Sequence, residues 1–214
     1  MNLNSINAIL ITHEHTDHTK CLNMLSNKYD IPIYITKKTW NALQYKDKIN
    51  YNNINFFAIS EEFYIKDLKI YPFSTSHDAA EPCGFSIYND SKKISIATDL
   101  GQVDNNILNN LKDSSAILLE ANYDPNILKY SKYPYLLKKR ISSSDGHLSN
   151  IEAGKTLSYL ANYGLNNAML IHLSKENNFP ELAYQTVIQE LENQKNIKID
   201  IAPRNNPSKL YNVI

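Results

Sequence analysis

The segment from Ala8 to Leu22, AILITHEHTDHTKCL, constrains the fold of this chain more than any other. An apolar run typical of a buried strand ends at His13, and three histidines and two acidic residues then occupy six consecutive positions. Residues two apart in an extended segment point to the same side, so His13 and His15 can bind one ion together. Asp17 and His18 follow at the point where we expect a helix to begin, and their side chains would face the position of a second ion nearby.

Chance is a poor explanation for this pattern. A single histidine is usually an ordinary surface or core residue, but the chain has only six among 214 residues. At that density HxHxDH would arise in on the order of one chain in several thousand. We therefore interpret the four residues together as metal ligands, and we assign no role to Glu14 and Thr16.

Three later strands are expected to end in a side chain of the same chemical type. LKIYPFSTS leads to His77, ISIAT to Asp99 and AMLI to His172. The rim of a sheet, where loops leave a rigid scaffold, is the usual place for catalytic groups. Imidazole and carboxylate groups without thiolate suit Zn²⁺ or Mn²⁺, so the sequence predicts a site for such ions at one sheet edge.

The remaining pattern predicts a layered α/β domain. Apolar β-type runs alternate with helical segments, and Ser149 or Asn150 precedes one of these segments as a candidate cap. The expected helices cover residues 107–115, 149–164 and 179–194. The expected strands are AILIT, PIYIT, FYI, LKIYPF, GFSIY, ISIAT, AILLEA, MLIH and IKIDIA.

Length and charge narrow the class of protein further. A chain of 214 residues suits one domain, 1–214, with a sizeable core. The 22 basic and 22 acidic residues balance, so any acidic partner must be held by a local patch. No apolar run is long enough to span a bilayer and no secretion signal is visible, so we expect a cytoplasmic protein without a membrane partner.

One local patch is basic and aromatic. The segment LKYSKYPYLLKKRISSS interleaves tyrosines with basic residues that include Lys138, Lys139 and Arg140. Cations neutralise phosphates and aromatic faces stack on bases, so this segment could hold a nucleic-acid strand leading to His147. The alternative is a solvated, charged loop.

These motifs resemble the metallo-β-lactamase fold superfamily, whose members hold two metal ions at one edge of an αββα sandwich. THEHTDH, with the later His77, Asp99 and His172, carries the general resemblance. HDAAEPCGF, IATDLG, LEANYD, SSSDGHLSN, HLSKENNFPELA and APRNNPSKLY are similar to signatures of the YycJ/WalJ group, which resembles DNA exonucleases. The resemblance covers nearly the whole chain and implies the four-layer αββα arrangement.

The resemblance also implies a role for each residue. His13, His15 and His77 would bind the first divalent ion, and Asp17, His18 and His172 the second. Asp99 would bridge the two ions, with a hydroxide between them as the nucleophile and Asp17 orienting it. His147 would contact phosphate or donate a proton. The alternative is that His147 is a loop residue without a role in the reaction and that Ser149 only caps the following helix.

One part of the family pattern is missing. Members of the group begin with a further β-rich segment that ends in a supporting aspartate, whereas this sequence begins MNLNSINAILIT. We therefore expect an N-terminally incomplete sandwich, whose exposed strand edges would favour aggregation or a homodimer.

Three functions remain open on this basis. The first is a dinuclear-metal phosphodiesterase acting on DNA rather than RNA, with 5′-to-3′ exonuclease polarity taken from the resemblance. The second is a small-molecule hydrolase of the same fold, such as a thioesterase or lactonase. The third is an inactive metal-binding fragment. His147 and the basic segment favour the first, because a neutral thioester needs neither.

Overall fold

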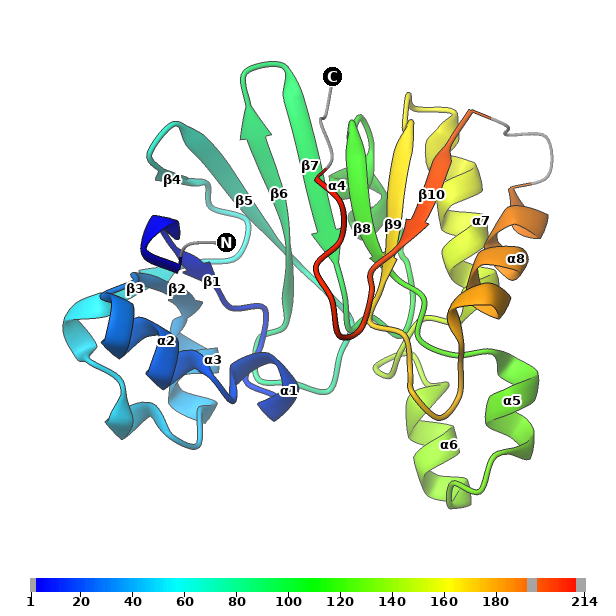
Figure 1. The fold of residues 1–214 in the computed structure, drawn as a ribbon, viewed down its shortest axis with the longest axis horizontal. Helices are drawn as coiled ribbons and strands as arrows, with labels where there is room; N and C mark the ends of the chain where they lie inside the picture. Colours follow the sequence, from blue (N-terminus) through cyan, green and yellow to red (C-terminus); the bar gives the residue numbers. More distant parts are fainter. Residues whose placement is uncertain (1–2, 192–195, 211–214) are drawn as a thin grey trace.

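Two β-sheets face each other in this computed structural model, which describes residues 3–191 and 196–210 (Figure 1). The small sheet is parallel, in the order β1-β2-β3. The large sheet is mixed, in the order β10-β9-β8-β7-β6-β5-β4. The strands are β1 (Ile9–Leu10), β2 (Ile33–Thr36), β3 (Ile54–Phe57), β4 (Phe63–Ile65), β5 (Leu68–Ser74), β6 (Cys83–Asn89), β7 (Lys92–Ala97), β8 (Ala116–Glu120), β9 (Asn167–Ile171) and β10 (Lys198–Ile201).

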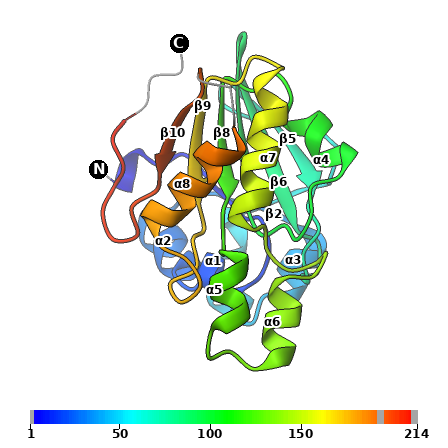
Figure 2. The ribbon, with the colours of Figure 1, turned by 90° about the vertical axis from the view of Figure 1, so that its right-hand side faces the viewer.

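Helices cover the outer face of each sheet. Figure 2 shows α7 and α8 in front of the large sheet, with α5 and α6 below them. The helices are α1 (Thr16–Thr19), α2 (Leu22–Tyr29), α3 (Lys37–Ala42), α4 (Asn105–Leu111), α5 (Pro125–Tyr130), α6 (Tyr135–Ile141), α7 (Asn150–Ala161) and α8 (Pro180–Glu190). Short 3-10 turns lie at Leu3–Ser5, Lys46–Lys48 and Tyr51–Asn53.

Three apolar clusters separate the layers. Ile33 and Ile35 of β2 are fully buried against Leu22 of α2, on the outer side of the small sheet. Between the sheets, Phe85 of β6 packs with Phe57 of β3. The largest cluster lies under α4, α7 and α8 and includes Leu111, Leu157 and Val187. The order helix, sheet, sheet, helix confirms the predicted αββα fold class.

Strand directions bring the functional residues to one edge. β5 and β7 are both antiparallel to β6, so they run in the same direction, and β8 and β9 are parallel to β7. The carboxyl ends of β5, β7, β8 and β9 therefore meet at one edge of the large sheet. That edge is where His77, Asp99, Glu120 and His172 are found.

Most predicted elements are present, with differences in detail. The predicted helix 179–194 is observed as α8, while residues 192–194 lie outside the described part of the chain. Ser149 caps α7 by accepting a hydrogen bond from the Glu152 amide at 3.2 Å, as predicted. The prediction omitted β3 and several short helices. In the described part of the chain, no helix has the length and apolarity needed to cross a membrane.

Candidate metal centre

All six histidines of the chain lie in one cluster at the edge where the two sheets meet. His13 and His15 are on the loop that leaves β1, while Asp17 and His18 lie in the single turn of α1. The large sheet contributes its residues from the loops after β5, β7 and β9. The structure thus brings together all seven residues that the sequence singles out as ligands.

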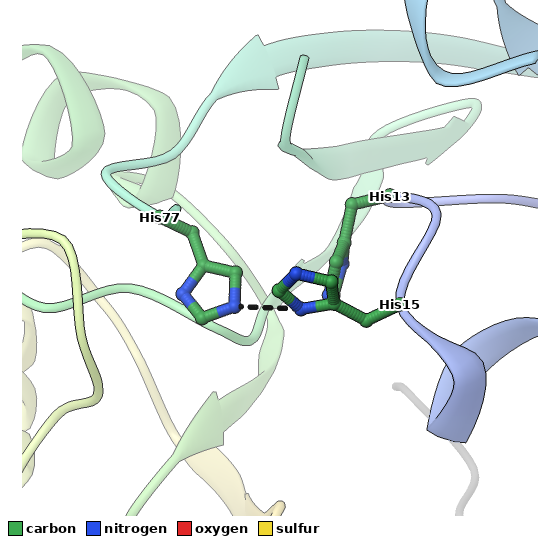
Figure 3. Close-up of side chains that lie close together, drawn as sticks. All are labelled: His13, His15 and His77. Atoms are coloured by element: carbon green, nitrogen blue, oxygen red, sulfur yellow. Dashed lines mark hydrogen bonds between the residues drawn. The ribbon is translucent and has the colours of Figure 1, made fainter. Parts of the chain in front are cut away.

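His13, His15 and His77 form the first group, and their imidazole rings converge in Figure 3. One ring nitrogen from each lies within 4.8 Å of the others. Nε2 of His77 is 3.2 Å from Nδ1 of His15. The Nδ1–H of His77 donates to the Gly146 carbonyl at 2.9 Å, and this bond fixes the tautomer that leaves Nε2 facing the group.

Asp17, His18 and His172 form the second group, again within 4.8 Å of one another. Nε2 of His18 lies 3.6 Å from Asp17 Oδ2, and Nε2 of His172 lies 3.5 Å from the same oxygen. Asp99 stands between the two groups. Its Oδ2 is 3.2 Å from His18 Nε2, and its Oδ1 is 3.7 Å from His77 Nε2.

This donor set fits divalent metal ions. The buried Nε2 of His13 has no hydrogen-bond partner among the described residues, although it points into a cluster of imidazoles. A buried polar atom without a partner is costly in free energy, and an ion bound to the nitrogen would remove that cost. Only imidazole and carboxylate ligands are present, as Zn²⁺ and Mn²⁺ prefer.

One histidine of each group has a strongly shifted pKa, and the two shifts are opposite in direction. Burial, followed by repulsion from His18, lowers the pKa of His13 to about 3, so its ring is neutral and ready to bind. Burial also acts to lower the pKa of His172, but the bonds to Asp17 and Glu120 outweigh it and raise the pKa to about 10. An ion at the second group must therefore displace a proton.

Glu120, the last residue of β8, organises the far side of the cluster. It is fully buried, and its Oε1 accepts hydrogen bonds from Nδ1 of His147 and Nδ1 of His172, each at 2.8 Å. Its Oε2 accepts the backbone N–H groups of Leu100 and Leu148 at 3.0 and 3.2 Å. Despite its burial, the bonds from the two histidines hold the pKa of the carboxyl below its usual range.

Backbone strain coincides with two of these residues. Asp99 (φ 54°) and His172 (φ 57°) adopt the left-handed conformation that residues with a β-carbon seldom take. Strain of this kind persists where the surroundings hold it, and it concentrates at functional sites. Here the Leu100 amide bound to Glu120 holds the turn after Asp99.

Asn122 and Asp124, which follow Glu120 in the LEANYD motif, have different roles. Asn122 donates to the His172 carbonyl at 2.8 Å, so it supports the loop that carries a candidate ligand. Asp124 caps α5 through the amides of Asn126 and Ile127 and only shapes a turn. One residue of the motif therefore supports a candidate ligand, and the other shapes a turn.

The three cations of the basic segment lie on helix α6 and point in different directions around it. Arg140 faces the cluster and pairs through two hydrogen bonds with Asp78, the neighbour of His77. Lys138 and Lys139 line a separate groove with Tyr135, on another face of the helix. Lys138 also donates to the Lys129 carbonyl at 2.8 Å. The structure therefore does not bring the three cations together, because consecutive helical residues are about 100° apart.

A cleft opens beside the candidate metal centre, between α6 and the loops after β9 and β10. It has a volume of about 560 Å³, and His147 and His172 are among its lining residues. Lys175 and Arg204 also line it. Sequence reasoning missed these two cations, because each stands alone in its own loop.

The chain resembles proteins of one family along most of its length. The model of the Beta-lactamase superfamily domain matches residues 1–173. The chain is 36% identical to "Exodeoxyribonuclease YycJ" of Bacillus anthracis, over 90% of this chain and 73% of that protein. It is 35% identical to "Exodeoxyribonuclease WalJ" of Streptococcus pneumoniae, over 87% of this chain and 70% of that protein.

Solved structures show the same fold. The metallo-β-lactamase fold protein YhfI of Bacillus subtilis superposes with a TM-score of 0.67 at 17% identity, covering 94% of this chain and 76% of YhfI. Zinc-bound PqqB of Methylobacterium extorquens gives a TM-score of 0.69 at 15% identity, covering 96% of this chain and 73% of PqqB.

Proposed function

Because this chain belongs to the metallo-β-lactamase superfamily and is a metal-dependent hydrolase, we propose that it cleaves phosphodiester bonds in DNA. Two divalent ions, Zn²⁺ or Mn²⁺, would be held by the two ligand groups, with Asp99 shared between them. When bound, these ions would act as Lewis acids that polarise the phosphate and lower the pKa of an attacking water.

The observation that carries this proposal is the position of His147. It belongs to neither of the two groups above, although one of its ring nitrogens also lies within 4.8 Å of ligand atoms of Asp99, Glu120 and His172. Glu120 holds its Nδ1 at 2.8 Å, and the ring lines the cleft. The bond fixes the tautomer, so Nε2 is the nitrogen that can exchange a proton with a bound substrate. An alkoxide is a poor leaving group unless it is protonated, and His147 would supply that proton when its Nε2 carries one in addition to the proton on Nδ1.

The other residues have distinct tasks in this proposal. Asp17 is an anion in the free protein, because the hydrogen bond from His172 lowers its pKa, and it would orient the attacking water. Glu120 would keep His147 and His172 in a fixed mutual orientation. Arg140 is held by Asp78 at the mouth of the site, where it would meet the approaching strand.

The names of the two bacterial relatives support DNA as the substrate and an exonuclease as the type of enzyme. A 5′-to-3′ polarity rests on the resemblance of the motifs alone. A single domain over residues 1–214, a homodimer and a cytoplasmic location stay predictions, which limited proteolysis, sedimentation and cell fractionation would test.

The direct test pairs metal analysis with a nuclease assay on the purified chain. We expect two metals per chain and nucleotides released from the 5′ end of labelled duplex DNA with added Mn²⁺ or Zn²⁺. The Asp99→Ala variant should lose both metal and hydrolysis. Two bound metals with intact DNA and cleaved thioester or lactone would instead assign a small-molecule hydrolase, and failure to bind metal would contradict both.

A further inference from the structure

We propose that Arg204 and Lys175 bind a phosphate of the DNA strand next to the bond that is cleaved. This proposal rests on the proposed function and identifies the part of the cleft that holds the substrate. The phosphate is one that does not react, and it can be either the terminal 5′-phosphate or an internal phosphate of the strand.

The position of the two cations supports this role. The cleft of about 560 Å³ has His147 and His172 in its lining, together with Arg140 on α6. Lys175 and Arg204 contribute from the loops that follow β9 and β10. In Figure 1 the red segment after β10 makes a turn in front of the large sheet, near the edge where α1 lies, before it runs back up. A DNA strand whose reacting phosphate reaches His147 therefore passes these two cations.

The guanidinium of Arg204 is oriented by the loop that carries a candidate metal ligand. Its Nη2 donates to the carbonyl of Leu173, the residue after His172, at 2.8 Å. Arginine has five N–H donors in a planar fork, so one backbone bond leaves most of them available for phosphate oxygens. The bond also keeps the cation at a fixed place relative to His172.

The balance of charge in the cleft favours an anionic ligand. Arg140 is paired with Asp78, and the carboxylate of Asp17 faces His172. Among the residues that the structure describes, neither Lys175 nor Arg204 forms an ion pair with a carboxylate. A DNA strand carries a negative charge at every nucleotide. Two cations without a carboxylate partner, next to a candidate phosphodiesterase centre, therefore favour its binding.

The experiment compares two substrates of the metal-loaded enzyme. One is labelled duplex DNA, and the other is bis(4-nitrophenyl) phosphate, a small diester without neighbouring phosphates. For Arg204→Gln and Lys175→Gln we expect the KM for DNA to rise about tenfold each, and the slope of log KM against log salt to fall by about one. Hydrolysis of the small diester should change by less than about twofold.

Matched variants separate charge from structure. The Arg204→Gln change removes the charge but keeps a side-chain N–H donor of the kind that bonds the Leu173 carbonyl. Lys92→Gln removes an exposed cation at the start of β7, the opposite end of that strand from Asp99, and should leave the KM for DNA within about twofold of the wild type. Arg204→Lys should recover part of the affinity for DNA.

The outcomes are distinct. A rise in KM confined to 5′-phosphorylated DNA identifies the terminal phosphate, and an equal rise with 5′-hydroxyl DNA identifies an internal one. An unchanged KM and salt slope in both variants would overturn the proposal while DNA cleavage by the wild type continues. If the wild type cleaves the small diester but not DNA, the proposed function fails first.

Discussion

At the scale of single residues, Glu120 shows how a buried charge is kept in this fold. Each of its two oxygens accepts two hydrogen bonds, from two imidazoles on one side and two backbone amides on the other. In Glu120→Gln the amide nitrogen can only donate, so it either faces two backbone N–H groups or requires both imidazoles to give up their Nδ1 protons. We expect the free energy of unfolding to fall by about 3 kcal/mol, measured by urea denaturation of the metal-free protein.

Glu152→Gln is the matched control for this change. Glu152 is exposed and pairs with Lys155 on the surface of α7, so its loss should cost less than about 0.5 kcal/mol. Equal stability losses in the two variants would show that the buried bonds of Glu120 do not matter as described.

The second residue-scale prediction concerns His147. Because it lies outside both ligand groups, His147→Ala should retain both metals while turnover of DNA slows by about 10²-fold. Metal analysis and steady-state kinetics on the same preparation check both parts. Loss of metal would make His147 a ligand, and unchanged turnover would remove it from the mechanism.

The third residue-scale prediction concerns the protonation of His13 and His172, one from each group of candidate metal ligands. His13 has a pKa of about 3 and is neutral at pH 7, whereas His172 has a pKa of about 10 and is protonated there. Of these two histidines, His172 is the one at which a metal must compete with a proton. Affinity for the second ion should therefore rise about tenfold per pH unit between pH 7 and 9, with release of about one proton.

Calorimetry in buffers of different ionisation enthalpy measures this release. His172→Gln should abolish the proton release and weaken the second ion, while the first ion binds as before. If the two ions show the same pH dependence in the wild type, the assignment of protons to the groups is wrong.

At the scale of elements, long periodic segments were predictable and short ones were not. The α7 segment has a capping serine and an apolar face that is buried at Ala153, Leu157 and Leu160, so local signals and packing agree. The β3 segment lies just after an Asn-rich 3-10 turn and has little alternation, and only pairing with β2 makes it a strand. Helix α6 depends similarly on contacts with Tyr133 and Leu128 that sequence alone does not reveal.

The residues of the candidate site also divide into those that the sequence predicts and those that it does not. Its ligands could be predicted because chemistry concentrates in HxHxDH and at strand ends. Arg204 and Lys175 could not, because their proximity depends on how the loops after β9 and β10 pack. Glu120 ends a strand, and only its burial in the structure shows that it bonds to the histidines instead of shaping a turn.

The contact between α7 and α8 yields an element-scale prediction. In an exposed helix Gly→Ala would stabilise by about 1 kcal/mol. A β-carbon on Gly154 would lie 2.5 Å from the β-carbon of Glu190 and 3.2 Å from the backbone of Val187, so the helices would have to separate. Gly154→Ala should therefore lower the free energy of unfolding by about 1–3 kcal/mol in thermal or urea denaturation, and any stabilisation would contradict the packing described.

At the scale of the whole molecule, the candidate metal centre connects the two sheets. His13, His15, Asp17 and His18 follow β1 of the small sheet, whereas His77, Asp99 and His172 follow strands of the large one. An ion bound by residues from both sides would act as a cross-link between them. The small sheet depends on this more, because its strands are two to four residues long and its buried cluster is small.

Chelation should therefore loosen the molecule unevenly. With metal at about 100 times its Kd, binding adds about 2.7 kcal/mol to the stability of the folded state. Because the cross-link ends at β1, we expect EDTA to speed amide hydrogen exchange more in β1, β2 and β3 than in β7, β8 and β9. Mass spectrometry of exchanged peptides resolves the two sheets. In Asp99→Asn, which lacks the shared carboxylate, the exchange pattern should match that of the chelated protein whether or not metal is added. Equal acceleration in both sheets would mean that metal stabilises the fold as a unit, without joining one sheet to the other.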